Sequence, residues 1–175
     1  LIVTSDGGST WVKNATLGGN SLLRDVHFFD KDTGWVVGNS DFIRHTTDGG
    51  VTWSAQTTTK TTHHVLDVHF VDDKTGWLAG NGRIYSTTDG GLTWNDSKVT
   101  GYGQYIQQLH FIDGTRGWAV GLYGGIVKTT DAGMTWTLEP KKTEQHLRGV
   151  FFLDDKRGWL TGDRGVLLKT VDGGL

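Results

Sequence analysis

Residues 46–53 read TTDGGVTW, an aspartate and two glycines set between threonines and followed by a tryptophan. The same string returns at residues 4–11 (TSDGGSTW), 87–94 (TTDGGLTW), 129–136 (TTDAGMTW) and, cut short, 170–174 (TVDGG). Its aspartates, Asp6, Asp48, Asp89, Asp131 and Asp172, are 42, 41, 42 and 41 residues apart. A constant spacing of this size indicates an array of one repeated structural unit.

A second landmark has the same period. A Gly-Trp pair places Trp35, Trp77, Trp118 and Trp159 at spacings of 42, 41 and 41 residues. Within one unit, short apolar stretches alternate in hydrophobicity and are separated by turn residues, whereas the 3.6-residue period of helices is absent. In one repeat the pattern predicts strand A at 65–71, strand B at 75–80, strand C at 83–88 and the start of strand D at 92–96.

Four short antiparallel strands per unit of this length predict an all-β fold, a β-propeller with the aspartate string as the hairpin between strands C and D. The composition agrees, since 27 of 175 residues are glycine and one is proline, a glycine content roughly twice the usual ~7%. We expect about four blades' worth of chain in one array that spans residues 1–175. Its predicted parts are strands C and D of an incomplete blade (1–20), three blades (21–62, 63–103 and 104–145) and a blade without strand D (146–175).

The aspartate string has a mechanical explanation. In a tight hairpin the aspartate accepts hydrogen bonds from the following backbone N–H groups and from a threonine hydroxyl, the glycines take positive φ, and the tryptophan ring is buried under the turn. Catalytic or calcium-binding aspartates are the alternative, but a residue that recurs once per unit is expected to maintain the unit. The predicted structural residues are Asp6, Asp48, Asp89, Asp131 and Asp172, with Trp11, Trp53, Trp94 and Trp136.

Composition also narrows the classes of partner. A net charge of -2 argues against a nucleic-acid-binding protein held by phosphate attraction. The chain has no cysteine, which excludes thiolate zinc sites and a cysteine nucleophile. No apolar stretch approaches the ~20 residues of a membrane-spanning helix, so we expect no membrane insertion. We expect no cofactor.

The loops that vary between repeats are the expected binding surface. The B–C and D–A loops share one face of an antiparallel blade, away from the aspartate hairpins, and variable loops carry function more often than repeated ones. Arginine and tyrosine are the residue types that anchor protein interfaces. The predicted protein-binding residues are Arg24, Arg83, Arg148, Arg164, His63, His64, Tyr102, Tyr105 and Tyr123, and the same D–A loops contain Lys141, Lys142 and His146. Ordinary solvated loop residues are the alternative.

Three histidines occupy one position in successive A strands, His27, His69 and His110, and Phe151 takes that position in the fourth repeat. A ring of metal ligands is one interpretation. Side chains on a blade strand point toward neighbouring blades, however, so a packing role is favoured and no metal site is predicted.

A hydrolase would need paired carboxylates about 5 to 10 Å apart. The chain has two glutamates, Glu139 and Glu144, and both lie in one loop. Asp25 and Asp67 recur in strand A and keep a carboxylate pair open. We expect no enzymatic activity, with a glycoside hydrolase as the alternative.

The strings resemble the Asp-box (BNR) repeat of sialidase-like propellers. The fuller unit, clearest at residues 26–53, 68–94, 109–136 and 150–174, is similar to the repeat of the photosystem II stability and assembly factor family. That resemblance implies a propeller, usually seven-bladed, that acts outside the cytoplasm (in a periplasm, a thylakoid lumen or as a secreted protein). It also implies a non-catalytic protein that assists assembly of a membrane protein complex, with a subunit of that complex as its partner.

Seven blades would need roughly 290 residues at this period, and the chain has 175. We therefore expect a segment of a larger propeller, or closure by strand swap or by self-association through open blade edges. Two functional hypotheses follow. One is a macromolecule-binding scaffold, and the other is a carbohydrate-active or carbohydrate-binding sialidase-like propeller.

Overall fold

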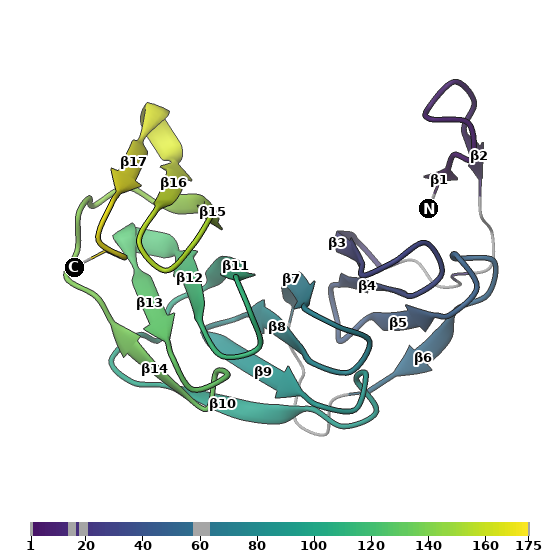
Figure 1. The fold of residues 1–175 in the computed structure, drawn as a ribbon, viewed down its shortest axis with the longest axis horizontal. Helices are drawn as coiled ribbons and strands as arrows, with labels where there is room; N and C mark the ends of the chain where they lie inside the picture. Colours follow the sequence, from purple (N-terminus) through teal and green to yellow (C-terminus); the bar gives the residue numbers. More distant parts are fainter. Residues whose placement is uncertain (1, 14–16, 18–20, 58–63, 175) are drawn as a thin grey trace.

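A computed structural model describes residues 2–13, 17, 21–57 and 64–174. Over these residues the chain forms seventeen β-strands and two short 3₁₀ turns, η1 (Leu122–Gly124) and η2 (Asp163–Gly165). The strands make an N-terminal hairpin followed by four repeated units, which we call blades I to IV, and blades II and III are joined in one eight-stranded sheet (Figure 1). The predicted all-β class is confirmed.

The elements follow one another in the order expected from the repeat. The N-terminal hairpin is β1 (Ile2–Val3) and β2 (Val12–Lys13). Blade I is β3 (Leu23–Phe28), β4 (Gly34–Gly38), β5 (Ile43–Thr46) and β6 (Ser54–Gln56). Blade II is β7 (Val65–Phe70), β8 (Gly76–Gly80), β9 (Arg83–Thr87) and β10 (Asn95–Val99), and blade III is β11 (Ile106–Phe111), β12 (Gly117–Gly121), β13 (Ile126–Thr129) and β14 (Thr135–Leu138). Blade IV is β15 (Leu147–Phe152), β16 (Gly158–Gly162) and β17 (Leu167–Thr170).

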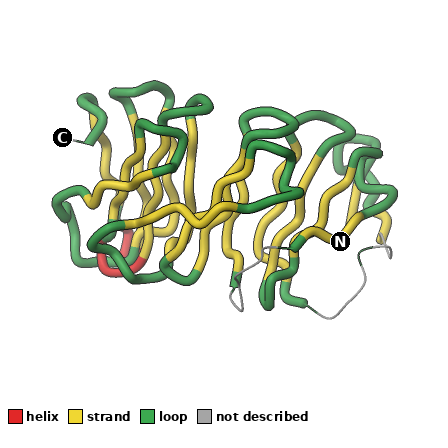
Figure 2. Tube along the Cα trace, turned by 90° about the horizontal axis from the view of Figure 1, so that it is seen from below, coloured by secondary structure: helices red, strands yellow, loops and turns green. Residues whose placement is uncertain are grey.

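Within each blade, neighbouring strands pair antiparallel in chain order, with a register shift at the start of strand A. A short parallel contact between β10 and β14 joins blades II and III at their outer strands. The blades form an open arc with the A strands toward its inner side, and the two chain ends lie at opposite ends of the arc (Figure 1). The strands run between two rims of loops (Figure 2).

Backbone hydrogen bonds define these two rims. On one rim the Asp-box turn donates to the A–B turn of its own blade, as in the bond from Gly49 N to Asp32 O at 2.9 Å. On the other rim the B–C loop donates to the D–A loop, as in the bond from Asp163 N to His146 O at 2.8 Å. We call the first the clip rim and the second the loop rim. Their separation is the one that an antiparallel four-stranded blade predicts.

The core lies between blades, and it explains the Gly-Trp pair. The indole of Trp77 stacks on the ring of Phe111 in the next blade at 3.4 Å between ring centroids, and its Nε1–H donates to the carbonyl of Ala132 at 2.9 Å. A Cβ at Gly76 would lie 2.4 Å from the Phe70 ring of its own blade, so only glycine leaves room there. Two further pairs repeat the stack, Trp35 with Phe70 and Trp118 with Phe152.

The Asp box folds as a hydrogen-bonded clip. In blade I the hydroxyls of Thr46 and Thr52 donate to the Asp48 carboxylate at 2.8 and 2.6 Å, and Gly50 N donates to the Thr46 hydroxyl at 2.9 Å. Hydrogen bonds from Thr52 lower the pKa of Asp48 from 3.8 to about 2. The same pattern surrounds Asp6, Asp89 and Asp131.

We expect acid to weaken the clip of Asp48. Because its pKa is lower folded than unfolded, the clip stabilises fully above about pH 4 and loses its contribution as pH falls through about 2. The difference in melting temperature between the chain and an Asp48→Ala variant should narrow from pH 5 to pH 2, measured by circular dichroism. Asp73→Ala, which removes an exposed aspartate from an A–B turn, is the control. A difference that stays constant down to pH 2 would contradict the clip.

The tryptophan that follows each clip differs between blades. Trp136 and Trp94 are buried, with 2% and 7% of their surface exposed, and Trp53 is half-buried. Trp11, in the N-terminal hairpin, is 58% exposed. The prediction that all four rings are buried under their turns is therefore wrong for Trp11. In blades I to III this ring meets a phenylalanine of strand A of its own blade, and among the described residues no such ring contact is seen for Trp11.

Candidate functional site

Arg148 is the most firmly held of the predicted binding residues. It lies near the start of β15 on the loop rim, where its Nε and Nη2 donate to the two carboxylate oxygens of Asp163 at 2.9 and 3.0 Å. Its Nη1 donates to Oε1 of Gln107 in blade III at 3.1 Å. The guanidinium is therefore held in a fixed orientation across the junction of blades III and IV.

Tyr123 and Arg164 share an unusual backbone position. They lie at the centres of η1 and η2, with φ of 56° and 57°, a region that non-glycine residues rarely adopt. Tyr123 N donates a hydrogen bond to Nδ1 of His146 at 2.9 Å, and the two rings meet edge to face at 4.9 Å. Tyr123 remains 52% exposed. A left-handed backbone held in this way presents the tyrosine ring to solvent.

The remaining arginines lie in other blades. Arg24, at the start of β3, donates from Nε to Oδ1 of Asn39 at 2.8 Å. Arg83 is the first residue of β9 and forms a close ion pair with Asp96 on β10. The loop rim thus carries arginines from blades I, II and IV, and Arg24, Arg83 and Arg148 are each held by a neighbouring oxygen.

The aromatic and histidine candidates divide into packed and exposed groups. Tyr102 is half-buried, its hydroxyl donates to the carbonyl of Leu122 at 2.9 Å, and burial raises its pKa to about 12. The Tyr102 side chain is therefore hydrogen-bonded to the first residue of η1. Tyr105 is 41% exposed. His64 is half-buried, and His63 lies outside the described residues.

Sequence reasoning missed the partners that orient the arginines. Neither Asp163 nor Gln107 was predicted to orient an arginine. The sequence does contain a signal, because Arg24 and Asn39 are 15 residues apart, as are Arg148 and Asp163. The residue that contacts the strand-A arginine thus recurs at one position of the B–C loop. What the structure brings together is a cluster at the junction of blades III and IV, comprising Arg148, Tyr123, His146, Gln107 and Asp163.

The strand-A carboxylates are occupied by contacts between blades. Oδ2 of Asp25 accepts the N–H of Val68, and Oδ2 of Asp67 accepts the N–H of Leu109, both at 3.0 Å. Burial, followed by the charge of Asp25, raises the pKa of Asp67 well above 3.8. Both carboxyl groups are thus engaged by backbone N–H groups of the next blade.

The three strand-A histidines form a row across the blades. The rings of His27 and His69 are 5.1 Å apart, those of His69 and His110 are 5.3 Å apart, and Phe151 lies 4.9 Å beyond. His110 contacts the carbonyl of Phe152 in the next blade through Nε2 at 2.9 Å. Burial lowers the pKa of all three, that of His69 to about 3 with help from its two neighbours. Within the described part of the chain, no group of three or more histidine or acidic residues is arranged to hold a metal ion.

A family model then connects the fold to known proteins. The model of photosynthesis system II assembly factor YCF48 matches residues 8–64 and 55–141, which together cover more than half of the chain. This chain belongs to the YCF48 family. No curated protein sequence matches it significantly.

Solved structures of YCF48 share the fold of this YCF48-family chain. One, from Cyanidioschyzon merolae, is 21% identical with a TM-score of 0.73 and is covered over 62% of its length by 97% of this chain. Another, YCF48 bound to D1 peptide, is 19% identical with a TM-score of 0.60, with 90% of this chain covering 64% of it. An ancestral GH74 enzyme has a TM-score of 0.72 at 15% identity, with 90% of this chain covering 24% of it. At these identities the likeness shows the fold alone.

The chain spans less than two-thirds of either YCF48 structure. Among the residues that the structure describes, no helix is long and apolar enough to cross a membrane.

Proposed function

We propose that this YCF48-family chain is a non-enzymatic, protein-binding scaffold whose loop rim recognises a subunit of a membrane protein complex during assembly. Two findings support the proposal: the family is described as an assembly factor, and one similar structure is YCF48 bound to D1 peptide. The family also supports an extracytoplasmic site of action. The net charge of -2 disfavours nucleic acid as the partner.

The observation that carries the proposal is the cluster at the junction of blades III and IV. A guanidinium whose orientation is set by Asp163 and Gln107 loses little rotamer freedom when it binds, so it contributes more to affinity than a mobile lysine. Beside it, Tyr123 offers an exposed aromatic ring on a constrained backbone. Arginine and tyrosine in this state are typical of the residues that dominate protein interfaces.

The carboxylates favour binding over catalysis. Asp25 and Asp67 are held by backbone N–H groups of neighbouring blades. Glu144 forms an ion pair with Lys141 at 2.8 Å. These contacts support packing and surface pairing, rather than catalysis, as the roles of Asp25, Asp67 and Glu144.

The test is a charge reversal on the loop rim. We expect the double variant Arg24→Glu/Arg148→Glu to lose a defined protein partner that the unaltered chain recovers from a native extract. With purified partner, the dissociation constant should rise by at least about tenfold, because each anchor is replaced by an opposite charge. The measurement is pull-down with quantitative mass spectrometry, followed by biolayer interferometry.

Arg157→Glu is the matched control, because Arg157 pairs with Asp154 on the clip rim. This variant should recover the same partner in the same amount. An equal loss of partner recovery in both variants would show a non-specific charge effect. Recovery of no protein, together with glycan-array binding that depends on Tyr105, would replace the proposal with the carbohydrate-binding alternative.

A further inference from the structure

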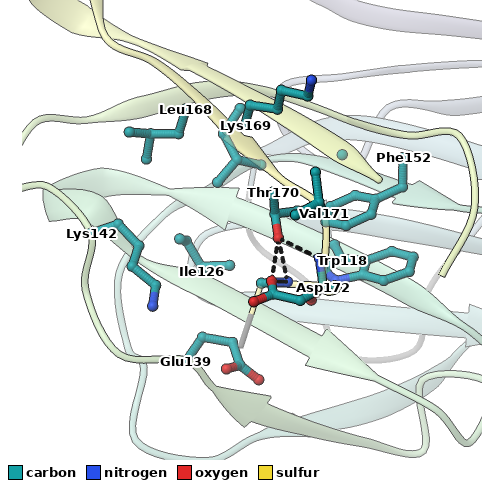
Figure 3. A pocket seen from close by; sticks show the side chains of 14 residues that line it. Trp118, Ile126, Glu139, Lys142, Phe152, Leu168, Lys169, Thr170, Val171 and Asp172 are labelled. Atoms are coloured by element: carbon teal, nitrogen blue, oxygen red, sulfur yellow. Dashed lines mark hydrogen bonds between the residues drawn. The ribbon is translucent and has the colours of Figure 1, made fainter. Parts of the chain in front are cut away.

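A histidine, a tryptophan and a phenylalanine meet at the junction of blades III and IV. His110 lies opposite Trp118 in the β11–β12 hairpin. The Trp118 ring stacks on the ring of Phe152 in blade IV at 3.7 Å between centroids (Figure 3). The carbonyl of Phe152 is also 2.9 Å from Nε2 of His110, which must donate because a carbonyl oxygen only accepts. Phe152 is therefore held twice, by its ring and by its backbone.

The other two junctions repeat this arrangement. His69 lies opposite Trp77, whose ring stacks on Phe111, and the rings of His69 and Phe111 are 6.3 Å apart. At the junction of blades I and II the corresponding residues are His27, Trp35 and Phe70. Among the described residues, strand A of each blade pairs with strand B alone and is the edge of its sheet. The histidine of one blade thus contacts the edge strand of the next.

We call His27, His69 and His110 the histidine row, and its members are close enough for their charges to interact. Adjacent rings are 5.1 and 5.3 Å apart between centroids, and all three side chains are half-buried. A neutral imidazole has one N–H to donate, whereas a second proton makes the ring a cation. Two cations at this distance in a partly buried site repel each other. The row is therefore most stable when its rings are neutral.

Few other charges offset this repulsion. The residue opposite each histidine in its hairpin is a tryptophan, and the row ends at a phenylalanine of β15. On β3 the charge of Asp25 raises the pKa of His27, but burial lowers it by more. Burial, together with the charges of His27 and His110, lowers the pKa of His69 to about 3. The pKa of Asp67, on the same strand as His69, is itself raised by burial, which limits the negative charge there.

We propose that the histidine row makes the blade junctions acid-sensitive: with neutral rings it holds blades I to IV together, and as the rings take up protons the junctions open. Opening moves a charged ring into water and away from its neighbours. It also separates that ring from the phenylalanine of the next blade and weakens the Trp–Phe stack at the same junction. The inference concerns the fold of the chain and is independent of the partner bound on the loop rim.

The sign of the pH dependence follows from linkage. The pKa of His69 is lower in the folded chain than its ordinary value of 6.5, so its contribution to stability is complete above about pH 7 and is lost as pH falls toward 3. Between pH 8 and pH 5 this residue should raise the equilibrium constant for unfolding by roughly 30-fold. Asp67 acts in the opposite direction, because its folded pKa is raised. Variants that all retain Asp67 carry the same contribution from it, so a comparison between them is free of it.

The first experiment compares His69→Gln with the unaltered chain. Glutamine keeps an N–H donor for the backbone of Phe111 but takes up no proton. Urea denaturation followed by circular dichroism gives the equilibrium constant for unfolding at pH 5 and at pH 8. The ratio of the pH 5 constant to the pH 8 constant should be roughly 30-fold smaller in His69→Gln than in the unaltered chain. An unchanged or larger ratio would overturn the proposal.

Two matched variants separate the row from general effects. Val68→Ala removes a buried side chain from the core between blades I and II, so it should raise both constants and leave their ratio unchanged. His45→Gln removes a histidine of β5 that stacks on Trp35 outside the row, and burial alone lowers its pKa. This variant should reduce the ratio less than His69→Gln does. An equal reduction would show that the row has no special part in the acid response.

The second experiment needs no variant and locates the opening. It measures amide hydrogen exchange of the unaltered chain, expressed as protection factors, at pH 8 and pH 5. The N–H groups that bond to the preceding blade should lose at least about tenfold more protection than clip N–H groups. The first set is Val68, Leu109 and Val150, and the second is Gly50 and Gly91. Equal losses would show that acid unfolds the whole chain at once, and they would contradict opening at the junctions.

Discussion

Replacing Trp77 with alanine should lower the free energy of unfolding by about 3–5 kcal/mol. The indole is fully buried, stacks on Phe111 at 3.4 Å between centroids, and donates its N–H to the carbonyl of Ala132 at 2.9 Å. The substitution opens a cavity between blades II and III and leaves that carbonyl without its donor. Chemical denaturation followed by circular dichroism measures the loss.

The chain offers a matched control at the same repeat position. Trp159 is only half-buried, because the described structure has no blade beyond blade IV to stack against it, and Lys169 lies over its ring. Trp159→Ala should therefore lower the free energy of unfolding by less than half as much as Trp77→Ala. Equal losses would mean that the tryptophans act within their own blade, which would contradict stacking between blades as the source of stability.

Replacing Asp67 with asparagine should stabilise the chain at pH 7 by at least about 1 kcal/mol. Burial and the charge of Asp25 raise the pKa of Asp67. At neutral pH the folded chain must therefore either take up a proton at Asp67 or bury its charge, and both cost free energy. An asparagine keeps an oxygen for the N–H of Leu109 and carries no charge for burial or Asp25 to disfavour. At the same repeat position in blade III a neutral side chain is already present: Oε1 of Gln108 accepts the N–H of Val150 in the next blade at 2.9 Å.

The sign of the pH dependence follows from linkage. The pKa of Asp67 is higher in the folded chain than in the unfolded chain, so stability is highest below about pH 4 and falls as pH rises toward the folded pKa. The advantage of Asp67→Asn should therefore appear above pH 4 and vanish below it in thermal melts. Gln108→Glu is the reciprocal variant, and it should introduce a loss of folding stability that grows as pH rises. An Asp67→Asn variant that is less stable than the parent at pH 7 would show that the carboxylate is needed in its charged form.

Much of the fold could be predicted because the repeat is local. The clip depends on residues within eight positions of one another, so the string TTDGGVTW already contains the donors, the acceptor and the glycines that it requires. The alternation within strand A likewise predicts which residues face a neighbouring blade. The candidate arginines and tyrosines could be placed on one rim for the same reason, since strand direction decides which loops share a face.

The packing between blades could not be predicted from such local patterns. The Nε1–H of Trp77 donates to a residue 55 positions later, and Arg148 reaches Gln107, 41 positions earlier. No local pattern connects such partners, because their meeting depends on the angle between successive blades. The same holds for Trp11, whose sequence matches that of the buried tryptophans although its ring is exposed.

The repeat length, the strands, the clips and the division of loops into a constant rim and a variable rim follow from the sequence alone, because hydrogen bonds within a hairpin depend only on neighbouring residues. Which side chains meet across blades depends on the tertiary structure: the Trp–Phe stacks, the bonds from the next blade to Asp25 and Asp67, and the orientation of Arg148. Those contacts arise from stacking twisted sheets, and each blade buries its apolar face only when another blade covers it.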